Sequence, residues 1–558
     1  MAPIMSVIKN IINHPGESLK KVKMIIMTTN LKIGNQKGAL FYITKNPESP
    51  AKEFKTTTQK ESSQKTTDNN QMNISEEPKF AKENERWLSH LYYNLDIPQL
   101  FEDIKQKMSY NKSTPEVKVP AWKTTRRQIT QEKINSETSY LLSLLIKSES
   151  AGSRLKRLEN FLSHLITYPE AKEYAVEEGV IPSLLEFQKL SRDASTTHIV
   201  RQILVTLGYV EPPKSYGVRL LSIDGGGMRG IAVINMLEKL EELSGRKILE
   251  LFDFVCGVST GAIIICCLLP PHEMSLSEIK DLYRNLSAQV FTQSTLRGTS
   301  NLVWSHGYYD TAAWEKLLKC YVGETKLLDS AKHEICPKAA TISTIINKSK
   351  VAPYIFRNYD YPYNRKSEYA GSINHTMFQA VRASAAAPTI FEEFRIGDIL
   401  HQDGGMIVNN PAAVAVHEVR TLWPDESLSC VVSCGTGKLL PTMFQDEISA
   451  DAKQTSSSWK TIFNKILESA TDTEAVHNML NDLLPEDVYY RINPHLSRKV
   501  TMDDVHETTI SLLEADTEMY YRRNKEKFQE IVKKLLLPRS KVQLCQDYVM
   551  TKLREIKH

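Results

Sequence analysis

The sequence lacks the features of a disulfide-stapled, zinc-binding or membrane-spanning protein. Its 558 residues contain only eight cysteines, with no CxxC pair and no histidine-rich ligand spacing. Cysteines that lie mostly within apolar runs are typical of reduced core thiols in an intracellular protein. The longest apolar run, residues 262–269, is far shorter than the roughly 20 residues of a transmembrane helix. We therefore expect no structural zinc, and any contact with a membrane should be made from its surface.

Acidic residues are scarce near the start of the chain. Residues 1–130 contain 21 Lys and Arg against 13 Asp and Glu, an excess of +8, whereas the whole chain carries +4. Such a segment either lies against anionic lipid, where each basic group contributes about 1 kcal/mol, or is a solvated tail. The first 45 residues hold seven Lys and one Glu, which is typical of an organelle-targeting segment, but no Arg precedes Arg86. These interpretations stay open.

Composition and periodicity divide the chain into five segments. Residues 46–85 are rich in polar groups, so they cannot bury enough surface to offset their ordering entropy. The expected segments are a basic, largely disordered region at 1–86, a poorly defined connection at 87–137, a helical module at 138–213, an α/β domain at 214–440, and a mainly helical C-terminal extension packed on that domain at 441–558.

The helical module carries apolar residues at helical spacing from about residue 138. Gly179 and the Ile181-Pro182 pair separate two of its helical patterns, which resembles an armadillo repeat. Only one copy of the pattern is clear, whereas repeat arrays need about three copies for stability. We therefore expect a small armadillo-like module that packs on the α/β domain and offers a surface for a protein partner or for self-association.

The pattern changes to alternating strands and helices after residue 213. Residues 218–223 and 251–258 are short buried-strand patterns, and residues 231–243 between them have one apolar helical face. A further strand pattern covers residues 429–435. Strand, helix and strand in this order predict a βαβ unit and a mostly parallel sheet, and hence the α/β fold class.

A possible nucleophile lies where the second strand pattern ends. Gly257, Ser259 and Gly261 fit GxSxG, in which a strained strand-to-helix turn lifts the serine hydroxyl clear of the sheet. The apolar run that follows predicts the helix, whose N-terminus would direct partial positive charge at a developing oxyanion. GxSxG alone is a weak pattern and also fits an ordinary tight turn.

A glycine-rich loop follows the first strand pattern, and two interpretations of it compete. Gly225, Gly227 and Gly230 satisfy GxGxxG, which could cradle a dinucleotide pyrophosphate at a helix start. The consecutive glycines could instead direct backbone N–H groups at a tetrahedral intermediate. The neighbouring GxSxG favours the second interpretation, because a dinucleotide site does not require an exposed serine on the next strand.

A third motif, Asp403-Gly404-Gly405, would alone be an ordinary turn. Together, DGGGxRG at 224–230, GxSxG at 257–261 and DGG at 403–405 resemble the patatin-like phospholipase family. The segment 382–391 also resembles the family sequence ahead of its catalytic Asp. The resemblance covers roughly residues 218–435, and the joint pattern is far more specific than any single motif. It implies a three-layer sandwich around a mostly parallel central sheet.

The resemblance also implies roles for individual residues. Ser259 is the expected nucleophile and Asp403 its general base, in a dyad without histidine. A Ser-His-Asp triad with His401 or His417 is the alternative, and the family resemblance argues against it. Arg229 is expected either to neutralise a lipid phosphate or to hold the glycine loop in place. The backbone amides expected to form the oxyanion hole are those of Gly225, Gly226 and Gly227, together with Thr260.

On this basis the chain is expected to be a calcium-independent phospholipase A-type acyl hydrolase. It would release fatty acid and lysophospholipid from membrane phospholipids, with no metal and no cofactor, since no calcium-binding loop is present. Its expected partner is a phospholipid membrane surface rather than nucleic acid. The resemblance suggests a peripheral location inside the cell, on mitochondrial, endoplasmic reticulum or peroxisomal membranes. The alternative is a nucleotide-binding regulatory protein or a lipid-binding scaffold that uses the glycine loop.

Overall fold

The computed structural model describes only part of the chain. The described residues are 130–147, 150–286, 290, 309–362, 364–388, 390–439, 473–502 and 504–556. The chain divides into two compact units, residues 1–119 and residues 120–558, and every described residue lies in the second. The expectations of a disordered region at 1–86 and of a connection beginning at residue 87 therefore fall outside the described residues.

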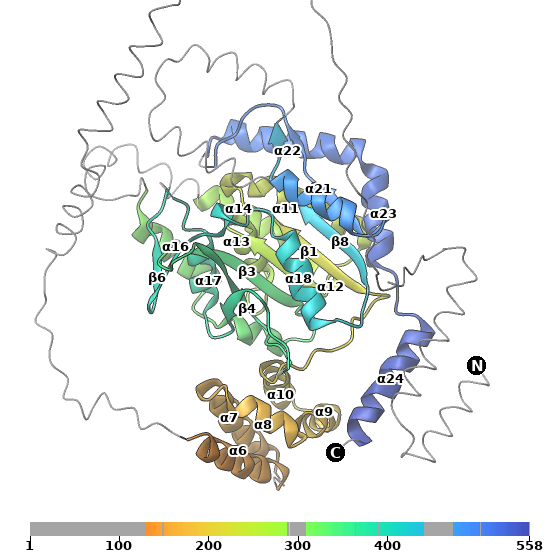
Figure 1. Ribbon diagram of the computed structural model, residues 1–558. Coiled ribbons are helices and arrows are strands. Elements are labelled where there is room, and N and C mark those ends of the chain that lie inside the picture. The colour runs from red at the N-terminus through yellow and green to blue at the C-terminus, as the bar shows by residue number, and fades with distance from the viewer. Residues whose placement is uncertain are drawn as a thin grey trace, which may run out of the picture. The chain divides into compact units, whose positions relative to one another are not determined.

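A helical module forms the first described part of the chain (Figure 1). Its helices are α6 (Gln131–Ile146), α7 (Ala151–Thr167), α8 (Ala171–Glu177), α9 (Val180–Leu190) and α10 (Ala194–Thr206). They enclose a small core of their own around the buried side chains of Leu158, Phe161 and Leu184. The module begins at Gln131 rather than near residue 138, because its first turns carry polar residues that hide the helical pattern. Its armadillo-like nature stays a prediction.

A central sheet follows, with nine strands within the described residues. Seven strands run in the order β10-β8-β1-β2-β3-β4-β5, and β7 pairs with both β3 and β6. The pairs β10-β8, β8-β1, β1-β2, β2-β3 and β4-β5 are parallel, whereas β3-β4, β3-β7 and β6-β7 are antiparallel. The strands are β1 (Val218–Ile223), β2 (Phe254–Val258), β3 (Lys338–Ile345), β4 (Ala352–Arg357), β5 (Ala370–Ser372), β6 (Phe394–Ile396), β7 (Ile399–Asp403), β8 (Leu428–Cys434) and β10 (Tyr489–Ile492).

The predicted βαβ unit is confirmed. Every residue of β1 and β2 is buried, which explains why neither strand shows a regular alternation of apolar and polar residues. Helix α11 (Gly230–Ser244) connects them and buries Ile234, Leu237 and Leu240. Leu220 lies opposite Phe254 in the parallel register. The glycine loop and Ser259 therefore both follow the carboxyl ends of neighbouring strands, at one edge of the sheet.

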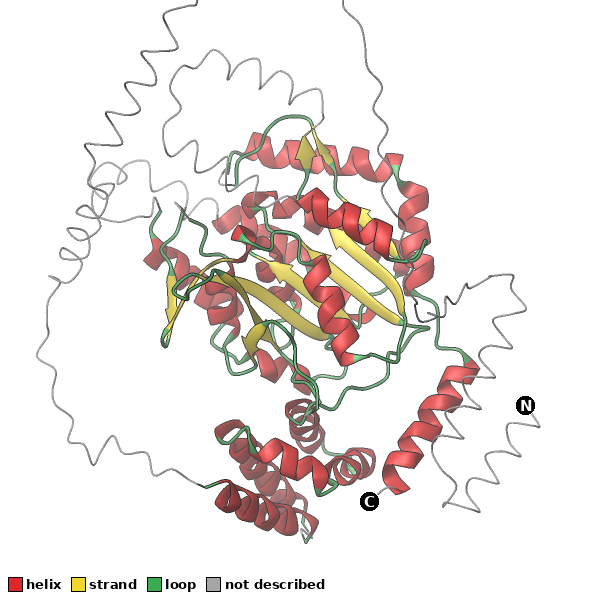
Figure 2. Ribbon diagram, viewed as in Figure 1, coloured by secondary structure: helices red, strands yellow, loops and turns green. Residues whose placement is uncertain are grey.

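Helices cover both faces of the sheet, so the predicted three-layer sandwich is confirmed (Figure 2). The larger core lies between one face and α11, α12 (Ile248–Leu251), α13 (Thr260–Leu268), α14 (Leu276–Leu286), α16 (Thr311–Val322), α17 (Met377–Ser384), α22 (Glu507–Arg523) and α23 (Lys525–Leu535). The second core lies between the other face and α18 (Ala412–Leu422) and α21 (Thr473–Leu483). The carboxyl ends of the parallel strands, where the glycine loop and Ser259 lie, are therefore packed between two layers of helices.

The C-terminal part of the chain contributes a strand to the central sheet. Strand β10 pairs in parallel with β8, and Tyr490 lies opposite Val432. The last segment is therefore not only a helical extension that packs on the domain, because it adds an edge strand to the central sheet. It also contains β11 (His495–Leu496), which pairs with β9 (Lys438–Leu439), and ends in α24 (Lys541–Ile556). Among the described helices, none has the length and apolarity required to cross a bilayer.

Candidate active site

Ser259 occupies the tight turn between β2 and α13, as the GxSxG pattern predicts. Its backbone has φ 52° and ψ −114°, a left-handed conformation that is strained for a residue with a side chain. A Cβ on Gly257 would lie 2.4 Å from a backbone carbon of Gly261, and a Cβ on Gly261 would lie 2.4 Å from the carbonyl oxygen of Ile223. Both glycines are therefore required, because the turn is packed directly against its own helix and against β1.

A buried serine outside the predicted set stabilises this strained turn. The backbone N–H of Ser259 donates a 2.8 Å hydrogen bond to Oγ of Ser384. The hydroxyl of Ser384 in turn donates to the carbonyl oxygen of Ile342 on β3, at 2.6 Å. Ser384 lies at the end of α17 within the family-like segment 382–391, and its side chain is fully buried. Sequence reasoning singled out this segment but assigned Ser384 no role, because its partner is 125 residues away.

Asp403 ends β7, which runs antiparallel to β3 and places Asp403 opposite Ser343. The hydroxyl of Ser259 donates to Oδ2 of Asp403 at 2.8 Å, and the backbone N–H of Gly405 donates to Oδ1 at 2.7 Å. A Cβ on Gly404 would lie 2.1 Å from the carbonyl oxygen of Ile342. The DGG motif is therefore a turn that brings a carboxylate close to β3 and within reach of the serine.

Asp403 is only 6% exposed to solvent. Burial raises its pKa from 3.8 to about 6, although the hydrogen bonds from Ser259 and Gly405 favour the ionised form. A carboxylate with a pKa near neutrality accepts a proton far more readily than one with a pKa near 4. The site therefore holds a hydroxyl group and a suitably basic acceptor in direct hydrogen-bond contact.

The two histidines of the alternative triad have other partners. His401 is fully buried, and its Nδ1 is hydrogen-bonded to the hydroxyl of Ser343 at 2.9 Å. Burial lowers the pKa of His401 to about 4, so its ring is neutral at physiological pH. His417 lies on α18, where Nε2 accepts the backbone N–H of Glu368 at 3.4 Å. Neither ring is hydrogen-bonded to Ser259 or Asp403, an arrangement that favours the dyad.

The glycine loop lies beside Ser259, and its geometry corrects one of the expected oxyanion donors. The N–H of Gly225 donates to the carbonyl oxygen of Asn409 at 3.1 Å, so this amide is already used. Gly227 begins a short 3-10 helix, and Thr260 begins α13. First-turn N–H groups have no acceptor within their own helix and are available to a ligand. The candidate donors are therefore Gly226, Gly227 and Thr260, without Gly225.

The packing of this loop explains its glycines without a bound dinucleotide. A Cβ on Gly226 would lie 2.2 Å from Oγ1 of Thr436, and a Cβ on Gly230 would lie 2.3 Å from Oγ1 of Thr260. A Cβ on Gly227 would lie 2.3 Å from a backbone oxygen of the C-terminal segment. The absence of a Cβ at these positions therefore allows the loop to pack closely against neighbouring parts of the chain.

Arg229 contacts the loop that it belongs to. Its Nε donates to the carbonyl oxygen of Gly226 at 3.3 Å. This contact supports the loop-holding alternative for Arg229, whereas a contact with a lipid phosphate stays a prediction. Within the described residues, no group of three His, Cys, Asp or Glu side chains is arranged to hold a metal ion.

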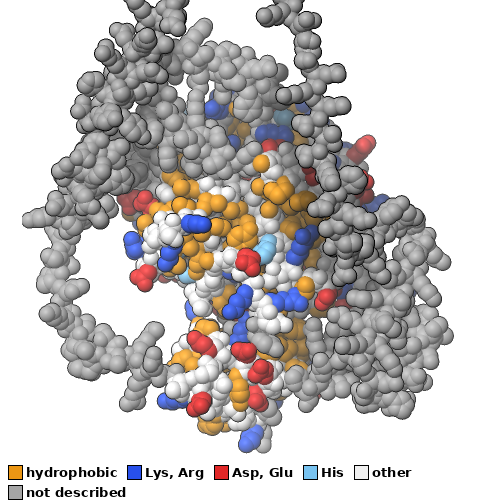
Figure 3. Space-filling view, in the orientation of Figure 1, with side chains coloured by type: hydrophobic (Ala, Val, Ile, Leu, Met, Phe, Trp, Pro, Cys, Tyr) orange, Lys and Arg blue, Asp and Glu red, His pale blue; other side chains and the backbone are white. Residues whose placement is uncertain are grey.

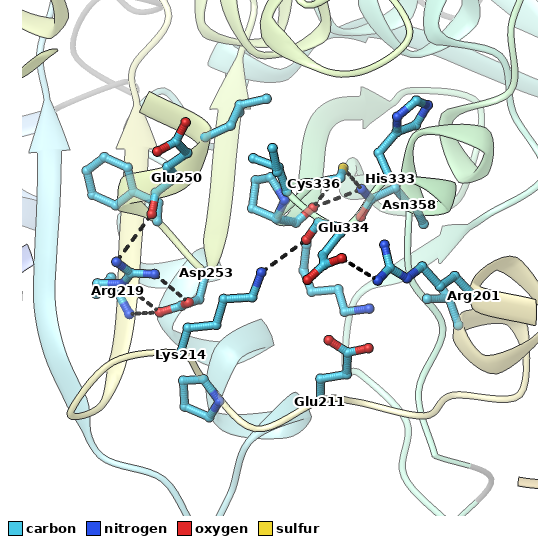
Figure 4. Close-up of a pocket in the computed structure, with 18 of the residues that line it drawn as sticks. Arg201, Glu211, Lys214, Arg219, Glu250, Asp253, His333, Glu334, Cys336 and Asn358 are labelled. Carbon is cyan, nitrogen blue, oxygen red and sulfur yellow. Dashed lines mark hydrogen bonds and ion pairs between the residues drawn. The ribbon is translucent and has the colours of Figure 1, made fainter. Parts of the chain in front are cut away.

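A cavity of about 470 Å³ lies at the opposite edge of the sheet (Figure 4). Its wall includes residues of α10, the linker after it, and the first residues of β1 and β3. Charged groups of the wall pair with one another: Arg219 with Asp253 at 2.8 Å, and Arg201 with Glu334 at 2.8 Å. Because the cavity lies at the other ends of the strands from Ser259, we assign it no part in the candidate site.

Comparison with known proteins agrees with this geometry. Residues 221–416 match the family described as patatin-like phospholipase. The chain is 39% identical over 427 residues to calcium-independent phospholipase A2-gamma of Rattus norvegicus, covering 76% of this chain and 54% of that protein. For the Homo sapiens protein of the same name the identity is 39% over 426 residues, covering 76% of this chain and 53% of that protein.

A plant protein is more distantly similar. Phospholipase A I of Arabidopsis thaliana is 29% identical over 451 residues, which cover 71% of this chain and 32% of that protein. The chain spans about half the length of the mammalian relatives named above. The family match contains the glycine loop, Ser259 and Asp403 in the order that the motifs predicted. The match to the patatin-like phospholipase family therefore includes the whole candidate dyad and its glycine loop.

Proposed function

We propose that this chain is a calcium-independent phospholipase A-type serine hydrolase with a Ser259–Asp403 dyad. The observation that carries the proposal is the 2.8 Å hydrogen bond from the Ser259 hydroxyl to Asp403, at a strained strand-to-helix turn. A buried carboxylate with a pKa of about 6 is a suitable general base at neutral pH. The similarity to calcium-independent phospholipases A2 supports phospholipid as the substrate class and independence from calcium.

In the first half of the reaction, Oγ of Ser259 attacks the carbonyl carbon of a fatty acyl ester while Asp403 accepts the hydroxyl proton. The carbonyl oxygen becomes an oxyanion, which the N–H groups of Gly226, Gly227 and Thr260 stabilise. The tetrahedral intermediate collapses with cleavage of the ester bond. Asp403 returns its proton to the departing lysophospholipid oxygen, and the acyl group remains on Ser259.

In the second half, water attacks the acyl-Ser259 ester. Asp403 accepts a proton from this water, and the same backbone N–H groups stabilise the second oxyanion. Collapse releases the fatty acid and returns the proton to Oγ of Ser259, so that the dyad is restored. Because the stabilising groups are backbone donors, neither half-reaction uses a metal ion.

The proposal includes a membrane surface as partner. On the face seen in Figure 3, hydrophobic side chains gather over the α/β domain, and charges of both signs lie around them and over the helical module. Ile407 lies four residues after Asp403 in the chain, and Met502 packs against Gly227. Their side chains are 39% and 40% exposed, respectively. Exposed apolar side chains beside a site are typical of surfaces that contact lipid or protein. We accordingly propose peripheral binding to intracellular organelle membranes, and a partner-binding role for the helical module.

A fluorophosphonate probe tests the proposal. The probe should react with one serine of the wild-type chain, and the protein should release fatty acid from phosphatidylcholine vesicles. Ser259→Ala should abolish both the labelling and the release. Its thermal unfolding should match that of the wild type, because only one half-buried oxygen is removed. Labelling of the variant at another serine would overturn the assignment of Ser259, and a wild-type chain without labelling or hydrolysis would overturn the proposed function.

A further inference from the structure

A buried ion pair lies directly behind the glycine loop. Asp224 and Arg491 are 1% and 4% exposed, and a nitrogen of Arg491 lies 2.7 Å from Oδ2 of Asp224. The same guanidinium group donates to Oγ of Ser433 at 2.9 Å and to Glu474 at 3.2 Å. Arginine suits this place because its planar group reaches several acceptors in fixed directions, which a lysine ammonium cannot do.

The ion pair joins the glycine loop to the C-terminal segment of the chain. Asp224 is the first residue after β1 and immediately precedes Gly225, whereas Arg491 lies in β10, beyond the family match that ends at residue 416. Within the described residues, Oδ1 of Asp224 has no hydrogen-bond partner, so Arg491 supplies the direct contact that holds this side chain. The position of Asp224 therefore depends on a residue 267 positions away.

A second contact from the same segment holds the other end of the loop. The N–H of Met228 donates to the carbonyl oxygen of Met502 at 2.9 Å. Between these two points, the hydroxyl of Thr436 donates to the carbonyl oxygen of Gly225 at 3.1 Å. The peptide groups that carry the candidate oxyanion donors Gly226 and Gly227 thus lie between two supports supplied by residues 491 and 502. The direction of these amides therefore depends on residues 491 and 502 together with the contacts from Asn409, Thr436 and Arg229.

We propose that Arg491 is a positioning residue for the oxyanion hole, acting through Asp224 on the amides of Gly226 and Gly227. This inference rests on the proposed hydrolase function. A donor displaced by about 1 Å costs on the order of 10²-fold in rate, and loss of one oxyanion donor costs about 10²–10³-fold in kcat. The C-terminal segment therefore belongs to the catalytic unit even though it contributes no group that touches the reacting atoms.

The test compares Arg491→Lys with a matched control, Arg219→Lys. Arg219 and Asp253 form an equally buried pair, with exposures of 6% and 9%, at the opposite end of β1 (Figure 4). Both variants keep the charge and lose the planar contacts, so both should lower the unfolding temperature. For Arg491→Lys, kcat per folded protein should fall about 10–100-fold with KM within about threefold, since a transition-state contact is weakened. Arg219→Lys should keep wild-type kcat.

Phosphonylation of the serine and the variant Asp224→Asn provide two independent tests. The rate of phosphonylation by a fluorophosphonate should fall with kcat in Arg491→Lys, because the phosphonyl oxygen uses the same amides. Asp224→Asn should show the same loss, and the double variant should lose no more than either single one if the pair acts as a unit. Undiminished kcat in Arg491→Lys, or an equal loss in Arg219→Lys, would overturn the inference. Inactive wild-type protein would instead overturn the proposed function.

Discussion

Replacing Asp403 with Asn should reduce activity and increase stability together. Asparagine keeps the shape of the side chain, and its Oδ1 can still accept the N–H of Gly405, while its amide can donate to Ser259. It cannot accept the proton of Ser259. If Asp403 is the general base, turnover should fall by about 10²–10⁴-fold, the usual contribution of such catalysis.

The stability effect follows from the raised pKa of Asp403. The folded chain binds this proton with a pKa of about 6, whereas the unfolded value is 3.8. The unfolded state therefore holds fewer protons than the folded state between these values, and wild-type stability falls as pH rises through this window. At about 1.36 kcal/mol per pKa unit, ionisation of Asp403 lowers the free energy of unfolding by about 3 kcal/mol above pH 6. Asparagine avoids this cost.

Two measurements on the purified proteins check this reasoning. Fatty acid release from phosphatidylcholine vesicles reports turnover, and thermal or urea unfolding at several pH values reports stability. Asp403→Asn should unfold at a higher temperature than the wild type at pH 8, and the difference should vanish below about pH 3, where the carboxyl group is protonated in both states. A variant that is less stable at pH 8 would refute the burial argument, and one that keeps more than a tenth of wild-type turnover would refute the role of general base.

Four further predictions concern the same site. Wild-type kcat/KM should fall as pH drops through about 6, because Asp403 must be ionised to accept the proton; a flat profile from pH 8 to pH 5 would contradict this. His401→Ala and His417→Ala should keep wild-type turnover per folded protein, although loss of the buried His401 ring should cost about 3 kcal/mol of stability; near-total inactivity of either variant would restore the triad. Ser384→Ala should lower kcat about tenfold, as the strained turn loses its N–H acceptor, with labelling of Ser259 slowed in parallel; unchanged labelling kinetics would exclude this role. Hydrolysis should persist in EDTA and EGTA, since backbone donors stabilise the oxyanion; activity that returns only with added calcium would refute the metal-free mechanism.

The sequence predicted those parts of the site that are local in the chain. Gly257, Ser259 and Gly261 lie within five residues between a buried strand and an apolar helix, so the turn could be recognised from its own neighbourhood. The pairing of Ser259 with Asp403 spans 144 residues, and it was expected only from the family resemblance. Periodicity alone gives no information about such a distance.

Other features could not be predicted because their partners are distant or are backbone atoms. The amide of Gly225 was expected at the oxyanion, but its acceptor is the carbonyl oxygen of Asn409, and no side-chain pattern reports on a carbonyl oxygen. The strand that residues 489–492 add to the central sheet was not predicted, because β10 has only four residues, too few for a clear strand pattern. The role of Arg491 was not predicted either, because a lone charged residue in a short segment is usually exposed to solvent.

The late position of β10 affects the order in which the chain can be completed during synthesis. Strand β8 ends at residue 434 and β10 begins at residue 489, so at roughly 5–20 residues per second the ribosome needs several seconds to supply the neighbour of β8. Until then, the apolar edge of β8 is open to pairing with another chain, and Asp224 lacks its contact with Arg491. A nascent chain that ends before residue 489 should therefore be prone to aggregation and should lack the proposed hydrolase activity.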